Sequence, residues 1–201
     1  LGNVHFAIDY LKNPDSYDSL GDHVLIIGAG NVAMDAARTI LRKSRAKVDI
    51  IFFRGREEVT ALEEELELAE VDGVKMNYYL NTVKIEPDGI IVEPVIKTEN
   101  EDGTITYTND SLHPYKISSS SVIIAIGQGA LSNIVKNTKQ IDTTQKGLIQ
   151  TTQNGATTRP GVYAAGDVVS GAKTVVEAVA ATKMVADEID QYVKQKHGIV
   201  E

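Results

Sequence analysis

The chain has 201 residues, with 20 Lys and Arg against 28 Asp and Glu, so its formal net charge at pH 7 is -8. This acidic balance argues against a protein that neutralises nucleic-acid phosphates, and 42% hydrophobic with 24% charged residues argues against wholesale disorder. The absence of cysteine excludes disulfide frameworks, thiolate metal sites and thiol redox relays, because each of these needs sulfur.

No stretch approaches the ~20 apolar residues of a membrane span, and the first residues lack the basic start and apolar core of a signal peptide. We therefore expect a cytoplasmic protein with neither a nucleic-acid nor a membrane partner. The chain starts with Leu1 rather than Met, which suggests a piece of a longer protein.

The first elements in chain order alternate between helix and strand. A short amphipathic helix is predicted near the start and is ended by Asn13-Pro14. Four consecutive apolar residues at 24–27 then lead directly into a glycine, which is typical of a strand buried on both faces of a parallel sheet. From 31 to 41, apolar residues recur at a spacing of four in two adjacent rows, which predicts a helix. A second strand at 48–53 and a second helical face follow, so we expect a βαβ unit; the apolar residues of that face are Val59, Leu62, Leu66 and Ala69.

After Asp72-Gly73 the pattern changes to extended pieces separated by turns at 87–89 and 101–103, which predicts hairpins. A further buried strand ends in Gly127, and we place a domain boundary there. Beyond it we expect a polar stretch to about residue 158, a short strand at 161–167 and a helix from about Thr174 to Lys194.

The glycine-rich turn between the first buried strand and its helix has the form G-x-G-x-x-A. Gly28 permits the tight turn, Gly30 lets the backbone approach a pyrophosphate, and Ala33 lets helix and strand pack closely. The phosphates would then lie on the free amides at the helix start, around Asn31 and Val32. The pattern predicts a Rossmann-like dinucleotide site, with a structural turn that binds nothing as the alternative.

The end of the second strand decides which dinucleotide is expected. NAD and FAD sites usually carry an Asp or Glu there, about 20 residues after the glycines. This chain has Arg54 and Arg56 with no acid between them, and two guanidinium groups suit a 2′-phosphate. NADPH is therefore favoured over NADH. The alternative is that both arginines face solvent or pair with Glu57 and Glu58.

Residues 57–72 contain eight carboxylates and no Lys, Arg or His. We interpret them as a solvated helix face rather than a docking surface for a basic partner. The four histidines show no metal-ligand spacing, so no metal site is predicted.

The residues at 21–42 and 53–74 together resemble the NADPH domain of the small subunit of glutamate synthase and related NADPH-handling flavoproteins. The resemblance implies that Arg54 and Arg56 recognise the 2′-phosphate. It also implies that Glu65, which matches a glutamate of the family's next helix, belongs to the cofactor-binding residues. Phe53 stands where the family commonly has a further arginine.

The resemblance continues in the stretches 122–128, 157–169 and 171–189, which look like the C-terminal part of the family's FAD domain. It implies that Gly127 and Gly166 belong to cofactor-binding stretches. It also implies that Asp167 accepts a hydrogen bond from the ribityl chain of FAD, and that the helix beginning near Thr174 points its amino end at the flavin.

The family's FAD domain begins with its own glycine-rich turn, and nothing before His23 matches one. We therefore expect an NADPH-binding domain at 20–127 and a partial FAD-binding domain made of 1–19 and 128–201. Alone, this chain is expected to bind NADPH and to hold FAD weakly or not at all.

The expected activity is that of an NAD(P)H-dependent flavoprotein oxidoreductase whose whole protein passes hydride from NADPH to FAD and onward to iron-sulfur centres or a partner subunit. We expect no catalytic side chain, because the cofactors carry the chemistry. Exposed valines at 175, 176 and 179 would favour a homodimer. A non-catalytic redox sensor that binds a nicotinamide nucleotide is the alternative.

Overall fold

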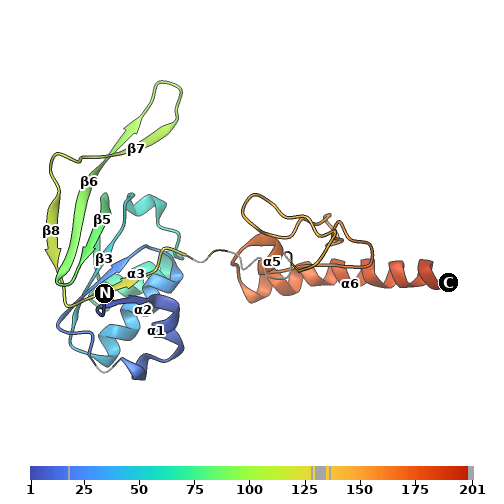
Figure 1. The fold of residues 1–201 in the computed structure, drawn as a ribbon, viewed down its shortest axis with the longest axis horizontal. Coiled ribbons are helices and arrows are strands. Elements are labelled where there is room, and N and C mark those ends of the chain that lie inside the picture. Colours follow the sequence, from blue (N-terminus) through green and yellow to red (C-terminus); the bar gives the residue numbers. More distant parts are fainter. Residues whose placement is uncertain (18, 128, 130–134, 136, 199–201) are drawn as a thin grey trace. The chain divides into compact units, whose positions relative to one another are not determined.

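The computed structural model describes residues 1–17, 19–127, 129, 135 and 137–198. The chain divides into two compact units, Leu1–Gly127 and Gln128–Glu201. Their elements are labelled in Figure 1. Residues 1–19, which the sequence groups with 128–201, lie instead in the first unit, because their strand and helix pack onto its sheet.

Five parallel strands form the main sheet of the first unit, in the order β1 (Val4–Phe6), β9 (Ser121–Ile124), β2 (His23–Ile27), β3 (Lys47–Ile51) and β4 (Lys75–Asn77). This sheet with its helices confirms the predicted α/β class. The prediction of hairpins for every extended piece after Gly73 is wrong for β4, which pairs in parallel with β3. Its three residues are too few for their pattern to reveal the direction of pairing.

Three helices cover one face of the sheet, namely α1 (Ala7–Lys12), α2 (Asn31–Lys43) and α3 (Glu63–Val71), with short 3-10 turns at Pro14–Ser16 (η1) and Arg56–Glu58 (η2). Apolar residues of β2 and β3 that alternate along each strand meet these helices, for example Val24 and Val48. The contact face of α2 is rich in alanine, which allows its axis to lie close to the strands. The predicted βαβ unit is thereby confirmed.

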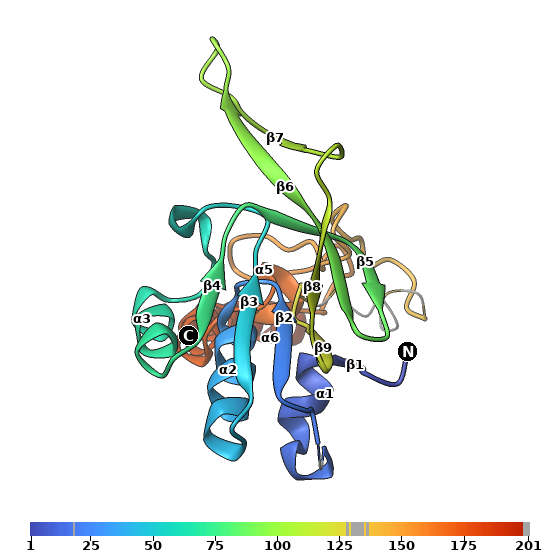
Figure 2. The ribbon, with the colours of Figure 1, turned by 90° about the vertical axis from the view of Figure 1, so that its left-hand side faces the viewer.

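A second, antiparallel sheet covers the opposite face, made of β5 (Leu80–Glu86), β6 (Gly89–Glu99), β7 (Ile105–Asn109) and β8 (Tyr115–Ser118). Its side chains Ile90 and Val92 form a separate core with Leu25, Ile51 and Val122 of the main sheet. The first half of β6 pairs with β5 and β8, and its second half pairs with β7 alone among the described strands. The β6–β7 hairpin therefore extends beyond the main sheet (Figure 2).

The second unit contains α5 (Asp167–Ser170), α6 (Val175–His197) and irregular chain joined by isolated bridges. The strand predicted at 161–167 is wrong: of the described residues in that segment, only Tyr163 forms a bridge, to Ala156. The predicted final helix is confirmed as α6. Within the described ranges, no helix is both long enough and apolar enough to cross a membrane.

Candidate functional site

The first glycine of the turn is required by the protein's own backbone. Gly28 has a φ of 114°, and its amide donates to the carbonyl oxygen of Ile51 at 3.0 Å. A Cβ on Gly28 would lie 2.5 Å from the carbonyl oxygen of Ala125. This glycine therefore lets the end of β2 pass between β3 and the end of β9, whether or not a ligand binds.

The second glycine has no such structural reason. Gly30 has φ -95° and ψ 176°, which any residue adopts, and a Cβ there would meet only the hydroxyl oxygen of Thr60, at 3.5 Å. The missing side chain leaves open space directly in front of α2. A glycine at this position leaves room for a ligand to approach the backbone closely.

The start of α2 offers free donors at that space. Gly30 is the N-cap residue, with no side-chain capping bond, and the first turn of α2 contains no acidic residue. The amides of Ala33 and Met34 donate to the carbonyl oxygen of Gly30, whereas those of Gly30, Asn31 and Val32 donate to no residue that the structure describes. Uncapped amides at the positive end of a helix are suited to bind an anion.

The remaining residues of the turn hold its shape. Ala33 is fully buried against the sheet, and the partly buried Val32 packs on the same core. The side-chain oxygen of Asn31 accepts from the amide of Leu62 at 2.8 Å, which ties the chain before α3 to the turn. The amides of Thr60 and Ala61 both donate to the carbonyl oxygen of Ala29, so this segment lies beside the open space.

Arg54 follows β3 and has no carboxylate partner among the described residues. Its guanidinium carbon lies 4.8 Å from the ring centroid of Phe53 and 5.4 Å from that of Tyr107. Its Nε is buried and has no hydrogen-bond partner in the described chain. A buried charged donor without a partner is costly, and an anionic ligand would satisfy it.

Arg56 has a different environment, although it also belongs to the predicted pair. Its guanidinium contacts Glu63 at 2.7 Å and Glu70 at 3.6 Å, both on α3. These contacts raise the pKa of Arg56, mainly through the hydrogen bond to Glu63. The alternative partners Glu57 and Glu58 are therefore not the ones that Arg56 contacts in this structure.

Glu65 is engaged within the first unit. Its carboxylate contacts Arg38 on α2 at 2.9 Å, and Arg38 also donates to Asp72 at 2.8 Å. The structure thus brings Gly28, Gly30 and Arg54 to one edge of the sheet, while Glu65 joins α3 to α2. Six of the eight carboxylates in the stretch 57–72 form ion pairs with basic side chains, so the stretch is more than the solvated helix face that the sequence indicated.

Two residues near Arg54 carry no signal in the sequence. Lys97 on β6 contacts Glu57 at 2.5 Å and Glu58 at 3.5 Å, and the hydroxyl of Tyr107 on β7 donates to Glu58. Both lie at least 40 residues along the chain from Arg54; the pairing of β6 with β7 places them opposite each other, and their contacts link them to the segment of Arg54.

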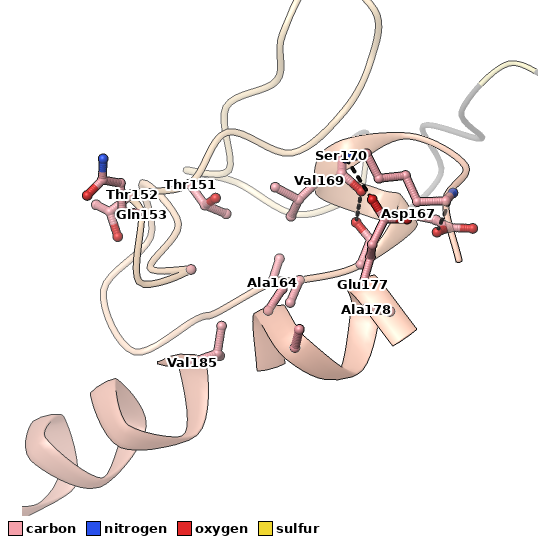
Figure 3. Close-up of a pocket in the computed structure, with 16 residues that line it drawn as sticks. Thr151, Thr152, Gln153, Ala164, Asp167, Val169, Ser170, Glu177, Ala178 and Val185 are labelled. Atoms are coloured by element: carbon pink, nitrogen blue, oxygen red, sulfur yellow. Dashed lines mark hydrogen bonds and ion pairs between the residues drawn. The ribbon is translucent and has the colours of Figure 1, made fainter. Parts of the chain in front are cut away.

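In the second unit, Gly166 and Asp167 line a pocket of about 300 Å³. Figure 3 shows Asp167, Ser170 and Glu177 gathered at one end of it, and Thr151, Thr152 and Gln153 at the other. Gly166 has φ 74° and ψ -152°, a conformation that favours glycine.

Asp167 is partly used by the chain itself. One carboxylate oxygen accepts from the amide of Lys173 at 3.2 Å, and the other accepts from no described residue. Thr174 caps α6 and forms a reciprocal capping box with Glu177.

Gly127 belongs to the first unit. A Cβ on Gly127 would meet none of the described atoms within 4 Å. No cluster of three metal-ligating side chains is found among the described residues.

Comparison with known proteins identifies relatives of this chain. It is 35% identical over 191 residues to "NADP(+)-dependent formate dehydrogenase subunit beta" of Moorella thermoacetica, with 91% of this chain and 27% of that protein covered. It is 27% identical over 222 residues to "Glutamate synthase [NADPH] small chain" of Azospirillum brasilense, with 98% and 45% covered. The chain thus spans less than half the length of these relatives.

Among solved structures, FprA of Mycobacterium tuberculosis in complex with NADPH matches all of this chain with a TM-score of 0.74, over 61% of its own length. The identity is 14%, so this likeness concerns the fold alone. The family model for pyridine nucleotide-disulphide oxidoreductases matches residues 2–182. The chain therefore belongs to the pyridine nucleotide-disulphide oxidoreductase family.

Proposed function

We propose that this chain is the NADPH-binding part of a flavoprotein oxidoreductase of the glutamate synthase small-subunit type. The whole protein would transfer hydride from NADPH to FAD and onward to iron-sulfur centres or a partner subunit. The relatives named above are subunits or chains of NADP-dependent oxidoreductases by their own names, and this chain covers only part of each.

The observation that carries the proposal is the open turn before α2. Gly30 has no structural need to be glycine, and three amides beside it, those of residues 30–32, are uncapped by the described chain. A pyrophosphate would fit both facts, because it needs close approach to the backbone and accepts hydrogen bonds from amides.

Arg54 supports the choice of NADPH over NADH. Its guanidinium has no carboxylate partner in the described chain and its Nε is unsatisfied. We propose that Arg54 holds the 2′-phosphate, while Arg56 contributes less because Glu63 and Glu70 compete for it.

The residues for FAD are proposed to be Gly166, Asp167 and the amino end of α6 at Thr174. Asp167 keeps one carboxylate oxygen that no described residue uses, which fits a hydroxyl donor. When bound, the nicotinamide supplies a hydride that the flavin accepts, and the residues of this chain contribute position and electrostatics.

The proposal is tested by calorimetric titration of the chain with NADPH, NADH and FAD in parallel. We expect NADPH to bind more tightly than NADH, and FAD to bind weakly. The purified chain should lack a strong flavin absorption band near about 450 nm, a wavelength typical of flavins.

Arg54→Ala and Arg56→Ala form a matched pair for the same titration. Arg54→Ala should weaken NADPH binding by roughly 1.5 to 3 kcal/mol, the usual effect of losing a hydrogen bond to a charged group, and change NADH little. Arg56→Ala should weaken NADPH binding by a smaller amount. If Arg54→Ala weakened both nucleotides equally, the 2′-phosphate assignment would be wrong.

A further inference from the structure

The acidic residues closest in sequence to Arg54 are held by side chains of the β6–β7 hairpin. Glu57 accepts from the ammonium of Lys97 at 2.5 Å and from the hydroxyl of Tyr79 at 3.2 Å. Glu58 lies 3.5 Å from Lys97 and accepts from the hydroxyl of Tyr107. Both carboxylates stay charged at neutral pH, since the bond from Lys97 lowers the pKa of Glu57 and the bond from Tyr107 lowers that of Glu58.

These contacts leave Arg54 as an unneutralised cation. Arg56 is occupied by Glu63 and Glu70, Lys97 is occupied by Glu57 and Glu58, and Arg54 contacts no carboxylate that the structure describes. The guanidinium instead lies over the rings of Phe53 and Tyr107, which contact each other edge to face, and cation–π attraction restricts its orientation without neutralising its charge.

If Lys97 and Tyr107 released Glu57 or Glu58, the freed carboxylate could pair with Arg54. They stand three and four residues after Arg54, and a carboxylate is the strongest protein partner for a guanidinium. A carboxylate paired with Arg54 would satisfy its donors and would also repel a phosphate.

We propose that Lys97 and Tyr107 are positioning residues for nucleotide choice: they hold the carboxylates of Glu57 and Glu58, so that Arg54 stays available to a 2′-phosphate. The inference rests on the proposed function and deepens it, because it places a determinant of NADPH preference on the β6–β7 hairpin, outside the βαβ unit. Tyr107 has a double role, as its ring flanks Arg54 and its hydroxyl holds Glu58.

The test compares Lys97→Met with the triple variant Lys97→Met, Glu57→Gln, Glu58→Gln in titrations with NADPH, NADH and 2′,5′-ADP. Lys97→Met should weaken NADPH and 2′,5′-ADP about three- to tenfold and leave NADH within about twofold, the scale of one or two partly exposed charge contacts. The triple variant should restore NADPH binding to within about twofold of the wild type. A merely structural role of Lys97 would not produce this rescue.

Lys116→Met is the matched control, because Lys116 also contacts two carboxylates, Glu86 at the end of β5 and Asp88 in the turn after it, and neither lies in the segment that carries Arg54. It should not change the NADPH to NADH ratio. Tyr107→Phe keeps the ring and should lose less NADPH affinity than Tyr107→Leu. Thermal unfolding of each variant checks that it is folded.

The outcomes separate this inference from the proposed function. If the wild type prefers NADPH but Lys97→Met keeps the same preference, or if the two glutamine substitutions fail to rescue it, the role of Lys97 is refuted and the NADPH assignment stands. If the wild type binds neither nucleotide, or binds both equally, the proposed function fails and this inference fails with it.

Discussion

At the scale of single residues, the two glycines of the turn before α2 have different reasons to be glycine. Gly28 has a positive φ, and a Cβ there would overlap the carbonyl of Ala125. Gly30 has an ordinary extended backbone and open space in front of it. A methyl group added at Gly28 should therefore change mainly the stability of the fold, whereas one added at Gly30 should change mainly the binding of the nucleotide.

Gly30→Ala should leave the free energy of unfolding within about 0.5 kcal/mol of the wild type, because its Cβ enters no occupied space. It should weaken NADPH binding by about tenfold or more, since the methyl group would stand between the amides and the pyrophosphate. Urea denaturation and calorimetric titration measure the two effects.

Gly28→Ala is the counterpart. It should lower the free energy of unfolding by about 1 to 3 kcal/mol, the usual cost of a strained backbone position.

Unchanged NADPH affinity in Gly30→Ala would show that the open space before α2 is not the phosphate site.

At the scale of elements, an ion-pair network joins α3 to α2. Arg38, whose side chain is 15% exposed, contacts both Glu65 and Asp72, and Arg42 contacts Asp72 at 3.4 Å. The hydrogen bond from Arg38 holds the pKa of Asp72 below its ordinary value of 3.8. The network fixes the helix that follows the segment of Arg54 and Arg56.

This network predicts a dependence of stability on pH. Because the folded-state pKa of Asp72 is depressed, its contribution is fully present well above pH 3.8 and is lost as the pH falls through the lower, folded value. Asp72→Asn should therefore be less stable than the wild type at pH 7, and the difference in urea midpoint should shrink below about pH 4.

Glu64→Gln is the control on the same helix, since Glu64 is exposed and forms no ion pair within the described residues. Its urea midpoint should follow the wild type at every pH. A difference between Asp72→Asn and the wild type that stayed constant from pH 7 to pH 3 would contradict the role of the ion pair.

At the scale of the whole molecule, the two units differ in how much they bury. The first unit has two hydrophobic cores between its layers, whereas the buried hydrophobic side chains described in the second unit are Ile141, Ile149 and Val185. On α6, Val175 is 79% exposed and Val176 is 77% exposed. Exposed apolar faces of this kind are typical of interaction surfaces.

Hydrogen exchange measured by mass spectrometry should therefore show weaker protection in α6 than in β2, β3 and α2, because local opening of α6 exposes little buried surface. If the chain dimerises through Val175, Val176 and Val179, as expected from the sequence, protection of α6 should rise with protein concentration. Equal and concentration-independent protection in α6 and β2 would contradict both expectations.

The local pattern was sufficient for the first half of the fold. The apolar run at 24–27, the spacing of four in α2 and the glycine turn between them are properties of neighbouring residues, and β2, α2 and β3 follow them closely. For the same reason the sequence alone indicates Gly28, Gly30 and Arg54 as candidate binding residues. The bridge near Tyr163 and the short β4 could not be assigned correctly, because a few extended residues carry no information about their partners.

Pairing between distant segments determined the rest. Several contacts of the site depend on which helices and strands pack together. Arg56 contacts Glu63 and Glu70, and Glu65 contacts Arg38. Lys97 and Tyr107 contact the segment that carries Arg54. A charge in the sequence specifies what a side chain can bind, but packing brings one oppositely charged group within 4 Å of it and keeps the others away. Hence residue types were enough to predict a ligand class, whereas they could not predict which arginine is paired with a carboxylate and which is not.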